Sequence, residues 1–174
     1  DAQSLRGELY ELGPHRLLCG DATVVTDLEA VIAGGPADLI FTDPPYNVGY
    51  VGGTADALTI ANDAMEDGAF RQFLRDAFAT MLAVSKPGAG IYVCHADSEG
   101  ENFRGALREA GWLLKQCVIW VKDQFVLGAR TITGSTSPFC TAGRPVPRTV
   151  GAAIGSRPPC GPSTARGATP STRR

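Results

Sequence analysis

The stretch Ala37-Asp38-Leu39-Ile40-Phe41-Thr42-Asp43-Pro44-Pro45-Tyr46 decides the fold of this chain. Its first six residues form a compact apolar run of the kind that makes a buried parallel strand. The two prolines cannot donate to a sheet ladder, so the strand is expected to end at Asp43. In open parallel sheets, ligands bind beyond the carboxyl ends of the strands. The stretch therefore predicts an α/β fold with a carboxylate and an aromatic ring on a stiff loop at the sheet edge.

Strand and helix patterns alternate on both sides of this stretch. Thr26 with Glu29 has the spacing of a capping box, which predicts a helix start. Ser98 with Glu101 has the same spacing. The alternation predicts an α/β domain with an incomplete, mainly parallel sheet and flanking helices. In chain order we expect two short strands within residues 8–19, a helix over 26–32, a strand over 37–42, a helix over 67–85, a strand over 90–95, a helix over 98–111 and a strand over 113–121.

The composition is that of an ordinary globular protein. The 174 residues, 44% of them hydrophobic, allow one domain with a real core. No apolar run is long enough to span a bilayer and no signal-peptide pattern opens the sequence, so a cytoplasmic protein is expected. The five cysteines are widely spaced and include no Cys-x-x-Cys pair, which predicts neither a disulfide framework nor a zinc site. His95 follows a predicted strand, where we expect a structural histidine with satisfied hydrogen bonds.

The net charge of −2 is the sum of an acidic first part and a basic second part of the chain. All 18 acidic residues lie at or before Asp123, together with nine of the 16 lysines and arginines, so residues 1–123 carry −9. From Gln124 onward there are seven arginines and no acid. Residues 129–174 are rich in Arg, Pro, Ser and Thr without a helical or strand period, a composition typical of disorder. We therefore divide the chain into a folded domain over residues 1–128 and a basic tail over 129–174.

The loop after the strand has residues that can assist methyl transfer to a nitrogen. An exocyclic base amine is a poor nucleophile because its lone pair is delocalised into the ring. The Asp43 carboxylate and the Pro44 carbonyl can each accept one N–H, which stabilises the charge that develops on the nitrogen. The rigid φ of Pro44 and Pro45 fixes the direction of the carbonyl. Tyr46 can stack on a base that has swung out of the duplex. A plain turn after a strand is the alternative interpretation.

The motif Thr42-Asp43-Pro44-Pro45-Tyr46-Asn47 resembles the catalytic DPPY motif of the amino-methyltransferases that modify adenine or cytosine amines in DNA. The resemblance extends over residues 8 to about 128. Leu18-Cys19-Gly20-Asp21 resembles the Gly-Asp element that precedes the motif in the subgroup whose catalytic half comes first. The later family strands are matched by Lys86-Pro87-Gly88-Ala89, by residues 91–97 and by Cys117-Val118-Ile119-Trp120.

This resemblance implies a Rossmann-like, S-adenosylmethionine-dependent methyltransferase fold. It implies a site-specific enzyme that moves a methyl group to an exocyclic base amine, with adenine preferred over cytosine. Asp43, Pro44, Pro45 and Tyr46 would act on a base flipped out of double-stranded DNA. Asp21 would lie near the adenosyl part of the cofactor, and a turn residue after a strand is the alternative for Asp21. The resemblance implies no metal and no membrane partner.

Two elements of that family are absent from residues 1–174. One is a His-Pro-Thr-x-Lys-Pro segment, and the other is a Gly-rich Asp-Pro-Phe-x-Gly-Ser-Gly turn that holds the methionine part of the cofactor. The DNA-contacting region expected between the two halves is missing as well. The resemblance therefore implies an incomplete methyltransferase that is inactive alone, and marginally stable because an apolar sheet edge is uncovered.

A slip of the reading frame is our interpretation of the tail. Family members continue after this point with a segment like Asp-Tyr-His-Trp-Gln-His-Glu-Pro-x-Leu-Tyr-Gly-Trp-Lys. If each codon from Arg130 to Arg144 is read one base early, the genetic code permits every step of that segment. Under this hypothesis, residues from about Ala129 onward were never selected as protein.

Two other functions stay open. One is a degenerate, non-catalytic domain that binds nucleic acid or a partner protein through its basic tail. The other is a methyltransferase for RNA or for protein amides. Those enzymes place their Gly-rich cofactor turn before the catalytic loop, and residues 1–42 contain no such turn.

Overall fold

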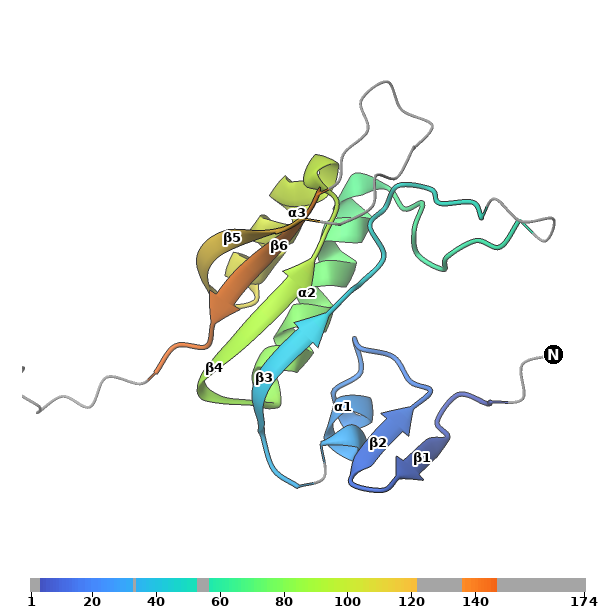
Figure 1. Cartoon of the computed structure of the whole chain (residues 1–174), viewed down its shortest axis with the longest axis vertical. Coiled ribbons are helices and arrows are strands. Elements are labelled where there is room, and N and C mark those ends of the chain that lie inside the picture. Colours follow the sequence, from blue (N-terminus) through green and yellow to red (C-terminus); the bar gives the residue numbers. More distant parts are fainter. Residues whose placement is uncertain (1–3, 33, 53–56, 122–135, 147–174) are drawn as a thin grey trace, which may run out of the picture.

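A computed structural model describes residues 4–32, 34–52, 57–121 and 136–146. The elements within these ranges are β1 (Leu9–Leu12), β2 (His15–Leu18), α1 (Val25–Val31), β3 (Ala37–Thr42), α2 (Asp67–Ala83), β4 (Ser85–Cys94), the 3-10 turn η1 (Asp97–Glu99), α3 (Gly100–Glu109), β5 (Leu113–Val121) and β6 (Thr136–Gly143). β1 and β2 form a hairpin, and the other strands form one sheet in the order β3-β4-β6-β5. Helices α2 and α3 lie on the same face of this sheet (Figure 1). Within the described ranges, no helix is both long enough and apolar enough to cross a membrane.

The α/β class is confirmed, but the sheet is mixed rather than mainly parallel. β3 and β4 are parallel, as expected for strands joined by a helix. β6 runs antiparallel to both of its neighbours, β4 and β5. Its position between β4 and β5 makes the sheet mixed.

The prediction that residues 129–174 lack regular structure is wrong for Thr136–Gly143, which form β6. Side chains on both faces of this strand are buried: Phe139, Cys140 and Ala142 are 8%, 1% and 4% exposed. A strand that is paired on both sides needs only a few small or apolar side chains to be buried, and composition alone does not reveal them. The rest of the predicted tail, apart from residues 144–146, lies outside the described residues.

Pro138 lies in β6, an inner strand of the sheet, yet its missing N–H does not cost a backbone hydrogen bond to β5. The His95 N–H donates to the Pro138 carbonyl at 3.4 Å, so the backbone groups of Pro138 face the β4 side. Cys94, paired with Phe139, is the last paired residue of β4. The missing N–H of Pro138 therefore points just beyond the end of β4, where the proline is tolerated.

The core lies between the two helices and one face of the sheet. The helix expected over residues 67–85 is α2, and its apolar residues at helical spacing are the buried ones. Full burial of one large apolar side chain contributes about 1.5–3 kcal/mol, so this layer supplies most of the stability. The cluster comprises Phe70, Leu74, Ala77, Phe78, Met81, Ile91, Val93, Phe103, Ala106, Leu107, Trp112, Cys140 and Ala142.

The opposite face of the sheet is largely exposed. Leu39 and Phe41 of β3 are 57% and 65% exposed, and Trp120 of β5 is 56% exposed. Ile40, which points the other way, packs against the core cluster. The prediction of a buried strand at residues 37–42 is therefore correct for one face and wrong for the other.

Both predicted capping boxes are wrong. α1 begins at Val25, before Thr26, and no side chain caps its first turn. Ser98 lies inside η1, which leads directly into α3, again without a side-chain cap. The hairpin at the start of the chain is confirmed, with Gly13 of its turn at φ +64°, a conformation that glycine adopts without strain.

Candidate functional site

The four predicted catalytic residues lie together on the loop that leaves the carboxyl end of β3. The Tyr46 hydroxyl donates a hydrogen bond to Asp43 Oδ1 at 2.6 Å. This pair forms part of the wall of a cavity of about 290 Å³. The cavity is lined by Asp43, Pro44, Pro45, Tyr46, Val48, Tyr50, Ile60 and Asp63.

A buried carboxylate, Asp63, holds this loop in place. It is 3% exposed. Its carboxylate accepts hydrogen bonds from the backbone N–H groups of Tyr46, Val48 and Tyr50 at 2.9, 3.4 and 2.6 Å. Its backbone carbonyl accepts a further bond from the Gly49 N–H at 2.6 Å. Charge-assisted bonds of this kind offset the cost of burying the charge, and they fix the loop that follows Tyr46.

Asn47 joins the same loop to the segment before α2. Its side-chain amide donates to the Met65 carbonyl at 3.1 Å and accepts from the Met65 N–H at 2.6 Å. Asn47 has φ +56°, a left-handed conformation that asparagine tolerates better than most residues. These two hydrogen bonds tie the start of the loop that follows Tyr46 to the segment that leads into α2.

The Asp43 carboxylate influences two neighbouring groups. Burial and the hydrogen bond to Asp43 raise the pKa of Tyr46 far above its ordinary range. Burial and the charge of Asp43 raise the pKa of the Cys94 thiol, at the end of β4, to about 11. Both groups are therefore protonated at neutral pH. The Tyr46 ring also meets Phe103 of α3 edge-on, with 6.5 Å between the ring centroids, which fixes its position over the core.

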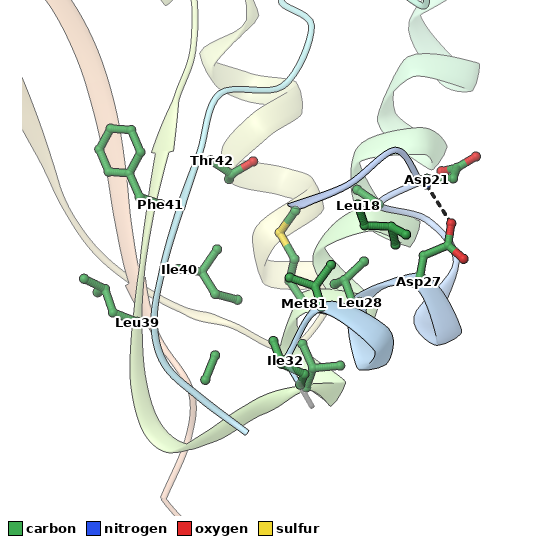
Figure 2. A pocket seen from close by; sticks show the side chains of 15 residues that line it. Leu18, Asp21, Asp27, Leu28, Ile32, Leu39, Ile40, Phe41, Thr42 and Met81 are labelled. Carbon is green, nitrogen blue, oxygen red and sulfur yellow. Dashed lines mark hydrogen bonds between the residues drawn. The ribbon is translucent and has the colours of Figure 1, made fainter. Parts of the chain in front are cut away.

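A second, larger cavity lies between α1, α2 and β3. Its volume is about 450 Å³, and Asp21 lines it. Figure 2 shows the apolar side chains of Leu28, Ile40 and Met81 pointing toward one another, with Asp21 at one edge. Thr42 lines this cavity and the next residue, Asp43, lines the smaller one, so both cavities reach the carboxyl end of β3.

Asp21 is itself held firmly. Its Oδ1 accepts bonds from the Thr23 hydroxyl at 2.7 Å and the Thr23 N–H at 2.9 Å. Its Oδ2 pairs with Arg6 at 2.9 Å. The Thr23 bonds are the main cause of the lowered pKa of Asp21, and Arg6 adds to it, so the group is ionised at neutral pH. The Asp21 N–H donates to Asp27 Oδ2 at 2.8 Å, the dashed line in Figure 2.

His95 does not line either cavity. It is 1% exposed, and its Nδ1 lies 2.8 Å from the Ala96 carbonyl. Its Nε2 lies 3.1 Å from Cys140 Sγ. Both ring nitrogens thus have partners, as expected for a structural histidine. In the part of the chain that the structure describes, no group of three acidic, histidine or cysteine side chains is placed to hold a metal ion.

The fold and the loop define the class of the protein: an α/β chain with a carboxylate–tyrosine pair at the carboxyl edge of its sheet. No family model and no curated protein matches it. Among solved structures it is similar to the complex of M1.HpyAVI with SAM, at 17% identity and a TM-score of 0.47, over 71% of this chain and 52% of that one. It is also similar to TTHA0409 of Thermus thermophilus, named as a DNA modification methylase, at 19% identity and a TM-score of 0.49, over 75% and 54%. The chain thus spans about half the length of these structures.

Proposed function

We propose that this chain carries the amine-activating site of an S-adenosylmethionine-dependent DNA amino-methyltransferase. The observation that carries the proposal is the Asp43–Tyr46 pair on the cavity at the carboxyl end of β3. A turn that merely ended a strand would not need a buried carboxylate, Asp63, to hold the residues that follow it. The proposed substrate is an exocyclic amine of a base in double-stranded DNA, adenine in preference to cytosine.

The cavity has the size and lining for one flat base. Tyr46 and Tyr50 offer aromatic surface, and Val48 and Ile60 offer apolar surface. Stacking of a base on an aromatic side chain contributes about 1–3 kcal/mol, which offsets part of the cost of unstacking it from the duplex.

Two hydrogen-bond acceptors on the loop would activate the amine. The Asp43 carboxylate accepts one N–H of the amine, and the Pro44 carbonyl accepts the other. Together they stabilise the positive charge that grows on the nitrogen as it attacks. The Tyr46 hydroxyl already donates to Asp43 and keeps the carboxylate oriented. This arrangement is preorganised because Asp63 and Asn47 fix the loop backbone before any substrate arrives.

The larger cavity fits the adenosyl part of S-adenosylmethionine. Its apolar walls suit a flat ring, and the ionised Asp21 carboxylate at its edge suits a hydroxyl or amine donor. When bound, the cofactor supplies an electrophilic methyl group, and positioning beside the amine supplies much of the rate. Residues 1–174 contain no Gly-rich turn for the methionine part. We therefore infer that transfer requires a further segment beyond these residues.

Nucleobase binding to the chain as it stands tests the proposal. Saturation-transfer NMR with adenosine should show contact to the base protons, and Asp43→Ala or Tyr46→Ala should each abolish it. Tyr46→Phe keeps the ring and should retain binding within about threefold, since the hydrogen bond that it loses is made to Asp43 and not to the base. Tyr10→Ala, which removes an exposed tyrosine of the hairpin, is the matched control. Binding of adenosine that survives Asp43→Ala and Tyr46→Ala unchanged would refute the proposal.

A further inference from the structure

Away from the DPPY loop, a buried thiol lies against a buried imidazole. Cys140 of β6 and His95, just beyond β4, are each 1% exposed, and Cys140 Sγ lies 3.1 Å from His95 Nε2. The His95 ring stacks on Phe103, with 5.3 Å between centroids and 30° between planes, so its orientation is fixed. The proposed methyl-transfer site uses neither group.

The neighbours of His95 determine where its proton lies. Nδ1 faces the Ala96 carbonyl at 2.8 Å, and a carbonyl only accepts, so Nδ1 carries the hydrogen. In the neutral ring Nε2 is then an acceptor, and the Cys140 thiol donates to it. The imidazole is thus positioned to take the thiol proton directly.

A second thiol lies directly across the sheet from Cys140. Cys117 of β5 is its partner in the antiparallel register. The backbone groups of Pro138 face β4, and so do those of Arg144, whose N–H donates to the Ala89 carbonyl at 2.8 Å. Because backbone groups alternate along β6, those of Cys140 also face β4 and not β5. Cys117 and Cys140 therefore form a non-hydrogen-bonded pair. The Cα atoms of such pairs lie about 4.5 Å apart, within the range that a disulfide bridges.

The two thiols differ in access. Cys117 is exposed and Cys140 is buried. Arg104 of α3 interacts with both of them, and this contact raises the pKa of its guanidinium. Burial raises the pKa of the Cys140 thiol, and Arg104 acts against that rise. Cys140 is therefore a protonated thiol at neutral pH whose developing thiolate has a cation and a base beside it.

We propose that Cys117 and Cys140 are an oxidation-sensitive pair that closes into an intramolecular disulfide when a hydroperoxide oxidises Cys117, with His95 as the base. The inference is independent of the proposed methyl-transfer function.

The steps balance without any further reactant. The Cys117 thiolate attacks the outer oxygen of the hydroperoxide, so the sulfur is oxidised to a sulfenic acid, the O–O bond breaks, and the alcohol or water leaves. Cys140 then gives its proton to His95 Nε2, and its sulfur attacks the sulfenic sulfur of Cys117. The S–S bond forms while the S–O bond breaks, and the leaving hydroxide takes the proton from His95 as water.

Peptide mapping of the full chain tests the proposal. The reduced protein is treated with one equivalent of hydrogen peroxide, alkylated in denaturant and cleaved with trypsin. Cleavage after Lys115, Lys122, Arg130 and Arg148 separates the two cysteines, so the disulfide appears as two linked peptides. We expect Cys117 linked to Cys140 within one chain. Intermolecular links alone, or Cys140 left reduced beside an oxidised Cys117, would overturn the proposal.

Three variants separate the roles. Cys140→Ala should leave a Cys117 sulfenic acid that dimedone traps, because its resolving partner is gone. His95→Gln should leave sulfenic acid formation unchanged but slow disulfide closure about tenfold or more, since glutamine cannot take the proton. Cys19→Ser, at another exposed cysteine, is the matched control and should close as the wild type does. Closure at the wild-type rate in His95→Gln would overturn the role of His95.

Discussion

At the scale of single residues, Asp63 determines the shape of the candidate site although it belongs to no recognised motif. Three backbone N–H groups of the loop depend on its carboxylate. Hydrogen bonds to a charged group contribute about 1.5–3 kcal/mol each. When the carboxylate is removed, the freed N–H groups can bond to water if the loop moves outward, which recovers part of this free energy. Asp63→Ala should therefore lower the free energy of unfolding in urea by about 3 kcal/mol and weaken adenosine binding.

Asp38→Ala is the control for this variant. The Asp38 side chain is 81% exposed and pairs with Lys86 at the surface. Such pairs contribute at most about 1 kcal/mol, so its free energy of unfolding should stay near that of the wild type. If both variants lost equally little stability, Asp63 would not be holding the loop.

The raised pKa of Cys94 makes the stability of the folded chain depend on pH, and the direction of this dependence follows from the direction of the shift. Its pKa is raised from 9.0 to about 11, so the folded state favours the protonated thiol. The contribution to stability is complete below pH 9 and is lost as the pH rises from 9 toward 11. The free energy of unfolding should fall over that interval, and Cys94→Ala should fall less steeply. Asp43→Asn should also flatten the curve, because it removes a charge that raises the pKa of Cys94.

The sequence predicted the residues of the site that are adjacent in the chain and missed those that are not. Asp43 to Tyr46 are recognisable because a strand and two prolines fix their position. Asp63 lies 17 residues beyond Tyr46, and nothing local distinguishes a carboxylate that turns inward from one that faces water. The role of Asp63 depends on the three-dimensional course of the loop, which the sequence does not reveal.

At the scale of elements, β6 is the part of the fold that is most open to test. Ala142 is 4% exposed between β4 and β5, whereas Val146, just after the strand, is 66% exposed. An unpaired buried carboxylate is costly, so Ala142→Asp should lower the free energy of unfolding by several kcal/mol, about 3 or more. Val146→Asp should change it by less than about 0.5 kcal/mol. Equal, small effects would mean that residues 136–143 do not form a strand in the sheet.

Periodicity predicted the long helix α2 well and missed the short strand β6. α2 was predicted within two residues because its apolar residues repeat over 17 positions. β6 has eight residues with a proline among them, too few for a composition-based prediction to separate it from the tail around it. The capping boxes failed for a related reason: a two-residue pattern is easily met by chance when the helix starts elsewhere.

At the scale of the whole molecule, the exposed sheet face and the proposed cofactor site both lead us to expect that this chain alone transfers no methyl group. Leu39 and Phe41 are exposed, and the sequence has no Gly-rich turn for the methionine part of the cofactor. The chain incubated with labelled S-adenosylmethionine and duplex DNA should therefore transfer no methyl group. Fusion to a segment that carries such a turn should restore transfer, and Asp43→Ala should abolish it again. Transfer by the unfused chain that Asp43→Ala abolished would contradict the need for a further segment.

The reading frame decides what the residues from about Ala129 onward represent. The shifted frame replaces Phe139 to Arg144 with Leu-Tyr-Gly-Trp-Lys, so an apolar segment falls on β6 in either frame. We expect the coding DNA, translated in all three frames, to continue with the Trp-rich segment and later with a His-Pro-Thr and a Gly-Ser-Gly turn. That result would explain why seven arginines follow an acidic domain. If no frame continued in this way, the basic tail would be a selected feature, and salt-sensitive DNA binding that is lost with residues 147–174 would then be expected.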